Sequence, residues 1–249
     1  MKRLLAATAL ALLAPPAAAI DLDALTGAER DAFRAEVRAY LLDNPEVLME
    51  AFEVLEMRQQ ASEAEAADMA IAANADLLYN SEFDWVGGNP DGDIVMVEFL
   101  DYRCGFCRRA HPEVDDLVDF DGDIKLIVKE FPILGEQSLL ASRFAIATRI
   151  ALGDDAYATV HDGLFEMRGD VSAPTLRDMA EGAGLDAGAI MAAMDDPLVD
   201  ATIEANHMLG QRLGISGTPS FVFGDQLVRG YVPYDGMTDI VASLRADAQ

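Results

Sequence analysis

Hydrophobic residues recur at helical spacing in the first part of the chain. Phe33, Val37, Tyr40 and Leu41 follow the sequence Thr26–Glu29, whose threonine and glutamate make a capping-box pattern. Apolar residues three or four positions apart form one stripe along a helix. The pattern therefore predicts a first amphipathic helix that begins after Thr26.

A second helix is predicted directly after the first. The segment Asp43–Glu46 stops the first helix, and Pro45 suits the first position of the next. A second apolar stripe comprises Val47, Leu48, Ala51, Phe52 and Leu55. Residues 58–76 are rich in Ala, Glu and Gln and predict a solvated helix or stalk. Two short helices cannot build a core, so we expect their apolar faces to pack on the main domain or, preferably, on another copy of the chain.

Strand patterns begin near residue 82. Residues 82–86 predict a short edge strand, ended by the glycines that follow. Ile94–Leu100 is a continuous apolar run broken only by Glu98, which is typical of a strand covered on both faces. A helix after Cys104 and a strand over Ile124–Phe131 complete a βαβ unit, so the two long strands should be parallel.

The second half of the chain predicts helices first and strands again afterwards. Residues 135–214 predict several consecutive helices, one of them from about Leu198 to Leu213. Gly153, Gly169 and Gly214 suit helix ends, and Ser172–Pro174 suits a helix start. Two apolar runs, residues 220–223 and 226–232, flank Gly224-Asp225 and predict a β-hairpin, and a last helix should begin at Tyr234. Without the helical block, a compact four-stranded α/β sandwich remains.

The first nineteen residues have the pattern of a secretory signal peptide. Lys2 and Arg3 precede the apolar stretch Leu4–Leu13, and Ala17–Ala19 is a small-residue cleavage signal. Ten apolar residues are too few for a membrane span, which needs roughly 20, so the alternative of an N-terminal anchor is disfavoured. Export implies an oxidising compartment, most simply a bacterial periplasm. We therefore expect a soluble periplasmic protein.

Composition excludes some partners. The net charge of −26 repels nucleic acid, and the 51% of hydrophobic residues is ample for a core. We interpret the acidic surface as a means of solubility.

The chain has only two cysteines, Cys104 and Cys107, separated by Gly105 and Phe106. They lie where a strand feeds a helix, and unpaired amides at a helix N-terminus stabilise a thiolate. A structural disulfide across so small a ring would stabilise the fold by only roughly 2 kcal/mol. The spacing therefore predicts redox chemistry at the two sulfurs.

Neighbouring residues bear on this chemistry. Three arginines close to the pair in sequence are expected to lower a thiol pKa: Arg103, Arg108 and Arg109. Zinc binding needs about four ligands, and the three histidines, His111, His161 and His207, show no ligand-like spacing. His111, four residues after Cys107, is either a modulator of the site or, as we favour, a surface residue. Copper(I) capture by the two thiols stays open as an alternative, since thiolates are soft ligands.

Three motifs resemble those of the thioredoxin superfamily, in particular of the periplasmic DsbA-like proteins. They are Glu98–Cys107, Lys129–Pro132 and Gly217–Phe221. The stretch Tyr40–Leu48 is similar to the N-terminal part of the suppressor-of-copper-sensitivity C proteins, which are DsbA-like proteins with an added helical segment. The resemblance implies an α/β thioredoxin fold over residues 79–249 with a helical insertion at about 135–214. Residues 20–78 precede it as a helical segment that is a candidate for oligomerisation.

The resemblance also implies roles for individual residues. Cys104 would be the exposed nucleophile, Cys107 the resolving thiol and Glu98 a buried acid that exchanges the proton of Cys107. A carboxyl inside a covered strand should have a raised pKa, whereas a Glu at a solvated strand edge is the alternative. Lys129 is a candidate partner for Glu98.

Thr218 and Pro219 match the cis-proline loop of the family. Proline is the residue whose preceding bond is most cheaply cis, and it brings no N–H to the sulfur. The backbone beside it can pair with an extended substrate strand. An ordinary surface turn is the alternative.

The residues between the cysteines indicate a direction for the reaction. Strong oxidants of the family have Pro-His there, whereas this chain has Gly105-Phe106, which predicts a weaker oxidant than DsbA. Thr218 before the proline also favours isomerases and reductases. We expect a disulfide isomerase or reductase without cofactor or metal, acting on secreted or periplasmic proteins and kept reduced by a membrane redox partner. A dithiol oxidase is the alternative.

Overall fold

The computed structural model describes residues 24–247. The signal peptide predicted over residues 1–19 lies outside this range. Between residues 24 and 247, no helix combines the length and the apolar character that a membrane crossing requires.

The chain divides into two units after Gln59. The first contains α1 (Gly27–Asp43) and the beginning of α2 (Glu46–Ala73). The capping box at Thr26 is confirmed, because its hydroxyl accepts from the backbone N–H of Glu29 while Thr26 N donates to the Glu29 carboxylate at 2.9 Å. Helix α1 has no buried residue. Large apolar side chains of this unit are exposed, among them Phe33, Val37, Tyr40, Phe52 and Leu55.

The stalk predicted over residues 58–76 belongs largely to the same helix, since α2 runs unbroken to Ala73. The expectation that this stretch has little to bury is wrong at two positions. Ala67 and Ile71 are buried, and Ile71 packs in an apolar cluster of the second unit with Leu78 of α3 (Ala75–Tyr79).

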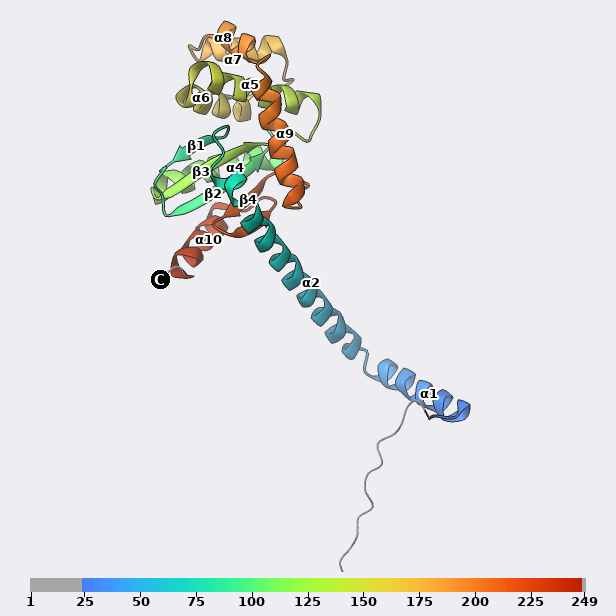
Figure 1. The fold of residues 1–249 in the computed structure, drawn as a ribbon. Coiled ribbons are helices and arrows are strands. Elements are labelled where there is room, and N and C mark those ends of the chain that lie inside the picture. The colour runs from blue at the N-terminus through green and yellow to red at the C-terminus, as the bar shows by residue number, and fades with distance from the viewer. Residues whose placement is uncertain (1–23, 248–249) are drawn as a thin grey trace, which may run out of the picture. The chain divides into compact units, whose positions relative to one another are not determined.

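The second unit is built on a five-stranded sheet with the order β1-β3-β2-β4-β5 (Figure 1). The strands are β1 (Trp85–Gly88), β2 (Ile94–Leu100), β3 (Ile124–Glu130), β4 (Ser220–Phe223) and β5 (Gln226–Arg229). Strands β2 and β3 are parallel, as the βαβ pattern predicts, and every other pair is antiparallel. The hairpin β4–β5 is confirmed, although β5 ends at Arg229 rather than Val232, before Gly230 with its φ of 89°.

The edge strand β1 differs from its prediction. The glycines taken as its end, Gly87 and Gly88, lie inside it and pair with β3. A Cβ on Gly87 would meet the indole of Trp85 at 2.3 Å, and a Cβ on Gly88 would meet the carbonyl oxygen of Ile124 at 2.4 Å. These glycines therefore allow close packing within the strand rather than a turn after it.

Alternate residues of the sheet face two separate apolar layers, as the period of two in a strand requires. On one face, Met96 and Leu100 of β2 pack with α4 (Gly105–Asp121) and α10 (Tyr234–Asp247). On the other face, Val97 and Phe99 pack with α3, the end of α2 and the end of α9. The central strand β2 is thus covered on both sides.

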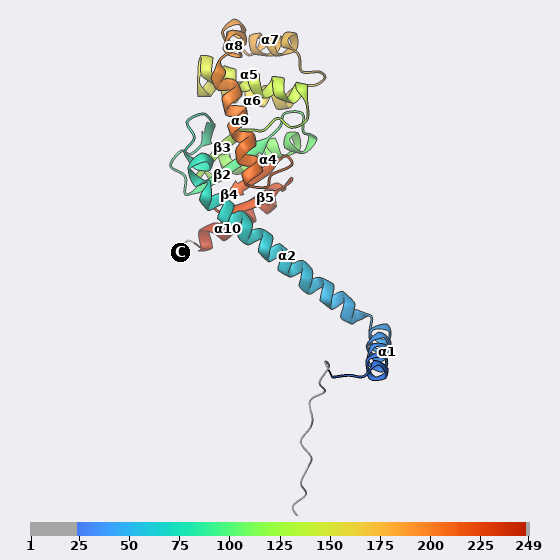
Figure 2. The same ribbon diagram turned by 45° about the vertical axis from the view of Figure 1, so that its right-hand side comes forward.

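The predicted helical block is confirmed between β3 and β4. It comprises α5 (Glu136–Leu152), α6 (Asp154–Glu166), α7 (Ala173–Gly182), α8 (Ala187–Ala193) and α9 (Pro197–Arg212). Figure 2 shows α5 to α8 gathered together, with α9 running from them to the sheet. Ser172 caps α7 as predicted, and Gly153 ends α5.

Candidate active site

Cys104 is the N-cap residue of α4, at the carboxyl end of the central strand. The buried carboxylate of Asp101 fixes the turn that leads to it. The backbone N–H of Arg103 donates to Asp101 Oδ1 at 2.8 Å, and those of Ile133 and Leu134 donate to Oδ2 at 2.8 and 3.0 Å. Sequence reasoning assigned no role to Asp101. An Asp two residues before Arg103 is the signal for an Asx turn.

Both thiols are reduced, and they differ in their surroundings. Cys107 is fully buried, and Cys104 keeps 8% of its surface exposed, so the expected exposed nucleophile is only narrowly accessible. Its Sγ lies 3.1 Å from the carbonyl oxygen of Thr218, to which the protonated thiol donates. The thiol that can be reached from solvent is therefore already aligned with the loop before Pro219.

Hydrogen bonds separate the pKa values of the two thiols. The pKa of Cys104 falls to about 5, first because the Cys107 side chain donates to its sulfur. Burial is the next largest influence and raises the pKa, and the Thr218 side chain and the backbone N–H groups of Cys107 and Phe106 lower it again. Burial raises the pKa of Cys107 far above its usual value, and the hydrogen bond to Cys104 and the charge of Glu98 raise it further. One sulfur is thus a thiolate at neutral pH and the other a thiol.

The three arginines that were expected to lower the Cys104 pKa are not among its main causes. Arg103 donates to the carbonyl oxygen of Gly169 at 2.8 Å, and Arg108 to that of Tyr102 at 3.4 Å. Arg109 lies over the ring of Tyr231, 4.4 Å from its centroid. Each guanidinium is directed to another partner, and the low pKa of Cys104 comes first from the hydrogen bond of the Cys107 side chain.

Glu98 is buried in β2, on the face that packs against α4, so the alternative of a solvated strand edge is wrong. Its Oε1 has no hydrogen-bond partner among the described residues. Burial raises its pKa to about 8, and the charges of Asp115 and Glu130 act in the same direction. A carboxyl that titrates near neutrality therefore lies close enough to Cys107 for their charges to interact.

The candidate pair between Lys129 and Glu98 does not exist. Glu98 is in register with Val128 and Phe99 with Lys129, so Lys129 and Glu98 face opposite sides of the sheet. The buried ammonium of Lys129 instead forms an ion pair with Asp84 and donates to the carbonyl oxygen of Leu77 at 2.6 Å. Burial lowers the pKa of Lys129, while Asp84 raises it.

The peptide bond between Thr218 and Pro219 is cis, as the sequence predicts. The carbonyl oxygen of Pro219 accepts from the N–H of Gly230 at 2.9 Å, and the Ser220 hydroxyl donates to the carbonyl of Gly217 at 2.8 Å. These bonds hold the loop against the hairpin, beside Cys104 Sγ.

An apolar surface surrounds Cys104. Phe106 is 59% exposed and stacks on Tyr231 with ring centroids 6.3 Å apart. Glu113 accepts from the Tyr231 hydroxyl at 2.6 Å and from the backbone N–H of Tyr234 at 2.7 Å, which ties this ring to α4. On the far side of the Asp101 turn, Ile133 and Leu134 are exposed. Sequence reasoning found Phe106 and missed Tyr231 and Glu113, since the contact joins residues more than a hundred positions apart.

A buried polar network lies behind the site, centred on Glu130 of β3. The hydroxyls of Tyr102, Tyr157 and Ser142 donate to its carboxylate at 2.7, 2.6 and 2.7 Å. Burial raises the pKa of Glu130 to about 7 against these three hydrogen bonds. Two of the donors belong to the helical block, so the network connects that block to the sheet.

The expectation that His111 is a surface residue is wrong. Its ring is largely covered, stacks on Phe165 and makes an edge contact with His161. His161 is buried beside the Tyr102 hydroxyl, 2.9 Å from its Nδ1, and burial lowers its pKa to about 3. His207 lies apart on α9, against Phe131.

These features define a protein of the thioredoxin-fold class, with a Cys-x-x-Cys pair at a helix start, a cis-proline loop opposite and a helical block inserted before that loop. Residues 95–242 match the family description "DSBA-like thioredoxin domain". The chain belongs to this family. Residues 29–62 also match "Copper resistance protein ScsC N-terminal domain" and contain no Cys or His.

Solved structures agree with this assignment. A thioredoxin-like oxidoreductase from Silicibacter pomeroyi is 41% identical, and the match has a TM-score of 0.66. It covers 70% of this chain and 98% of the Silicibacter chain. Proteus mirabilis ScsC in a transitional conformation is 30% identical, and the match has a TM-score of 0.66. It covers 91% of this chain and 100% of the ScsC chain. The similarity to ScsC therefore includes the N-terminal helices.

Among curated proteins, "Disulfide bond formation protein D" of Bacillus subtilis is 24% identical over 62% of this chain and 73% of its own length. A Na(+)/H(+) antiporter NhaA of Herminiimonas arsenicoxydans is 26% identical over 66% of this chain. The chain spans about a quarter of the length of that antiporter, so the similarity concerns one part of it.

Proposed function

We propose that the protein is a thiol–disulfide oxidoreductase that acts on protein disulfides, chiefly as an isomerase or reductase. The observation that carries the proposal is the opposite state of the two thiols. Cys104, with a pKa of about 5, is ionised at neutral pH and keeps 8% of its surface exposed, whereas Cys107 is fully buried and protonated. A thiolate is the attacking species in disulfide exchange, and a nearby thiol can displace the product.

The first step uses Cys104 alone. Its thiolate attacks one sulfur of a substrate disulfide, forms a mixed disulfide and releases the other substrate sulfur as a thiolate. If a substrate thiolate then attacks the mixed disulfide, Cys104 leaves as a thiolate and the substrate is isomerised with no net change of electrons.

The second step needs Cys107 and Glu98. Cys107 passes its proton to the Glu98 carboxylate, attacks Cys104 Sγ and releases the substrate thiolate. The substrate has then gained two electrons, and the site is left as a Cys104–Cys107 disulfide. A membrane-bound dithiol partner would return the electrons, and the reverse sequence would oxidise a substrate.

The substrate surface is the apolar rim around Cys104. The backbone at Thr218–Pro219 lies beside the reacting sulfur and can pair with an extended chain. Phe106 and Leu134 are exposed and suit the apolar segments that a misfolded protein exposes. Such contacts give affinity without requiring one sequence.

Two features favour isomerisation or reduction over oxidation. No histidine stands between the cysteines, and the pKa of Cys104 lies between the values near 7 of thioredoxin and near 3.5 of DsbA. The reduced form is therefore less stabilised than that of DsbA. The exposed apolar residues of α1 and α2 support self-association through residues 20–78, which would place several sites around one substrate.

Location is part of the proposal. The N-terminal pattern of residues 1–19 supports export to the periplasm. A protein from Salmonella enterica that is 26% identical is described as a periplasmic thioredoxin-like protein.

The test compares two serine variants on scrambled ribonuclease. We expect Cys104→Ser to abolish the recovery of ribonuclease activity, and Cys107→Ser to accumulate a mixed disulfide that reducing agent releases. Full activity in Cys104→Ser would end the proposal. A monomer whose reduction potential is as oxidising as the −120 mV or so of DsbA would favour the oxidase instead. In the remaining alternative the thiols hold copper(I), and tight stoichiometric binding without turnover in an anaerobic titration would support it.

A further inference from the structure

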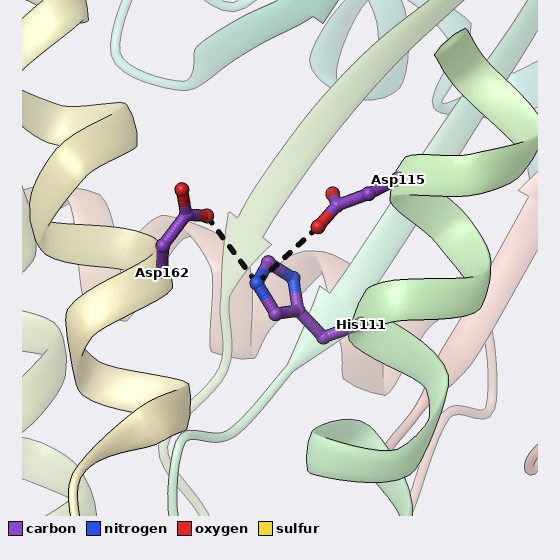
Figure 3. Close-up of side chains that lie close together, drawn as sticks. All are labelled: His111, Asp115 and Asp162. Carbon is purple, nitrogen blue, oxygen red and sulfur yellow. Dashed lines mark ion pairs between the residues drawn. The ribbon is translucent and has the colours of Figure 1, made fainter.

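A second cluster of ligand-type side chains lies on α4 and α6, starting one helical turn after Cys107. His111 Nε2 is 3.4 Å from Asp115 Oδ2 and 3.3 Å from Asp162 Oδ1. Figure 3 shows both carboxylates directed at the same ring nitrogen, one from the helix of His111 and one from α6. One ligand atom from each residue lies within 4.8 Å of the other two.

These separations are long for hydrogen bonds. A charged N–H···O bond usually measures about 2.7–2.9 Å, and the single hydrogen on Nε2 cannot serve two carboxylates well. Metal–ligand bonds of about 2.0–2.2 Å in a tetrahedron place neighbouring donor atoms about 3.4 Å apart. An octahedral arrangement with the same bonds would bring them to about 3.0 Å. The two distances at His111 are therefore closer to the donor spacing around a tetrahedral ion than to that around an octahedral one.

The histidine is held in place for such a role. Its ring stacks on Phe165, with centroids 4.6 Å apart, and makes an edge contact with His161 at 5.0 Å. The side chain of His111 is 13% exposed, whereas those of Asp115 and Asp162 are 50% and 61% exposed. A fixed nitrogen thus faces two carboxylates that an ion can reach from solvent.

The charge around the cluster favours a cation. The charges of Asp162, Asp119 and Asp116 act on Asp115. The charge of Glu166 acts on Asp162. Like charges are therefore crowded here, and a divalent ion would offset their repulsion.

We propose that His111, Asp115 and Asp162 form a site for a divalent transition-metal ion of the zinc type, with water as the fourth ligand. A neutral imidazole with two carboxylates suits Zn²⁺, whereas copper(I) prefers thiolates and Mg²⁺ and Ca²⁺ prefer six or more oxygens. The ligands come from the thioredoxin core and from the helical block, so the bound ion cross-links the two. An ion that binds only the folded state also raises its stability.

The test uses the chain from residue 20 onwards with Cys104→Ser and Cys107→Ser, so that the thiols bind no metal. Calorimetric titration with Zn²⁺ should show one equivalent bound, and Co²⁺ should give the intense visible absorption of a tetrahedral site. His111→Ala should weaken Zn²⁺ binding at least about 100-fold, since loss of a mere supporting contact to a ligand already costs 10–100-fold. Zn²⁺ should raise the melting temperature of the parent but not of His111→Ala.

Two further variants make the test decisive. Asp162→Asn changes an exposed side chain, should leave the fold intact, and should weaken Zn²⁺ binding at least about 10-fold. Asp116→Asn removes a neighbouring charge that is not a ligand, and it should bind Zn²⁺ within about 3-fold of the parent, as expected of a charge that acts only through space. Equal affinity in the parent, His111→Ala and Asp162→Asn, or no binding at millimolar Zn²⁺, would overturn the proposal.

Discussion

Glu98 and Glu130 are two buried carboxyls on the same face of the sheet, in the adjacent strands β2 and β3. Burial raises the pKa of Glu98 to about 8 and that of Glu130 to about 7. The two differ in their partners. Three hydroxyls donate to the carboxylate of Glu130, whereas Oε1 of Glu98 has no partner among the residues that the structure describes.

This difference separates a structural carboxyl from one available for chemistry. The oxygens of Glu130 accept hydrogen bonds from side chains of the turn after β2, of α5 and of α6, so a change of its protonation would disturb packing across three segments. Glu98 can gain or lose a proton without breaking a hydrogen bond at Oε1, and its charge acts on Cys107. Burial alone therefore does not identify an acid–base group; burial with an unpartnered oxygen beside a thiol does.

The largest expected effect is that of Glu130→Ala on stability. The change leaves the hydroxyls of Tyr102, Tyr157 and Ser142 without their acceptor, and each buried unpaired group costs about 1–3 kcal/mol. We expect the free energy of unfolding, measured by urea denaturation, to fall by roughly 3 kcal/mol or more. Glu204→Ala, at an exposed position of α9, is the control. A loss below roughly 1 kcal/mol would show that the network does not stabilise the fold.

Glu98→Gln should instead increase the free energy of unfolding near neutral pH. Between the ordinary carboxyl pKa of about 4.3 and the folded pKa of about 8, the folded protein keeps a proton that the unfolded chain releases. Glu98 therefore lowers stability progressively as the pH rises through this window. Near pH 7 the cost is on the order of 3 kcal/mol.

Glutamine stays neutral, so the reduced variant should be more stable than the parent near neutral pH and nearly equal to it near pH 4. Denaturation at several pH values measures this, with Glu204→Gln as the matched exposed control. A gain in stability that is the same at both ends of the window would contradict the raised pKa of Glu98.

Local patterns were sufficient to predict the parts of the site that depend on neighbours in sequence. The apolar run Ile94–Leu100 and the helix start at Cys104 each follow from a few adjacent residues, and the cis bond before Pro219 follows from the resemblance of its loop to that of the family. The role of Glu98 was implied by the same resemblance, and the cost of a charge inside a buried strand agrees with it.

The remaining residues depend on register and on the docking of the helical block. Lys129 was given the wrong partner because a shift of one residue in a strand moves a side chain to the other face. The role of Glu130 was missed because Ser142 and Tyr157 reach it from α5 and α6. His111 was taken as a surface residue because no pattern near it shows that α6 covers it.

A kinetic experiment tests whether the Glu98 carboxylate accepts the proton of Cys107. In Glu98→Gln the step in which Cys107 resolves the mixed disulfide should slow by about 10-fold or more, because the proton acceptor is lost. The wild-type rate should rise with pH around the Glu98 pKa of about 8, and the variant should lose this dependence. Rapid quenching of a preformed mixed disulfide measures the rate. Glu130→Gln is the control, and its rate per folded molecule should equal that of the parent. An equal slowing in both variants would show that Glu98 and Glu130 do not differ in their effect on this step.

The smallest expected effect concerns the pKa of Cys104, and it tests whether Glu98 acts on Cys107 without acting on Cys104. The pKa of about 5 depends first on the Cys107 side chain and also on the Thr218 side chain, and Glu98 is not among its main causes. Thr218→Val keeps the shape and removes the hydroxyl, and the loss of one hydrogen bond worth about 0.5–1.5 kcal/mol should raise the Cys104 pKa by up to about one unit. Glu98→Gln should leave that pKa unchanged, as titration of the thiolate by its ultraviolet absorbance can measure. A larger shift in Glu98→Gln than in Thr218→Val would mean that the Glu98 carboxyl acts on the attacking sulfur of Cys104 as well as on Cys107.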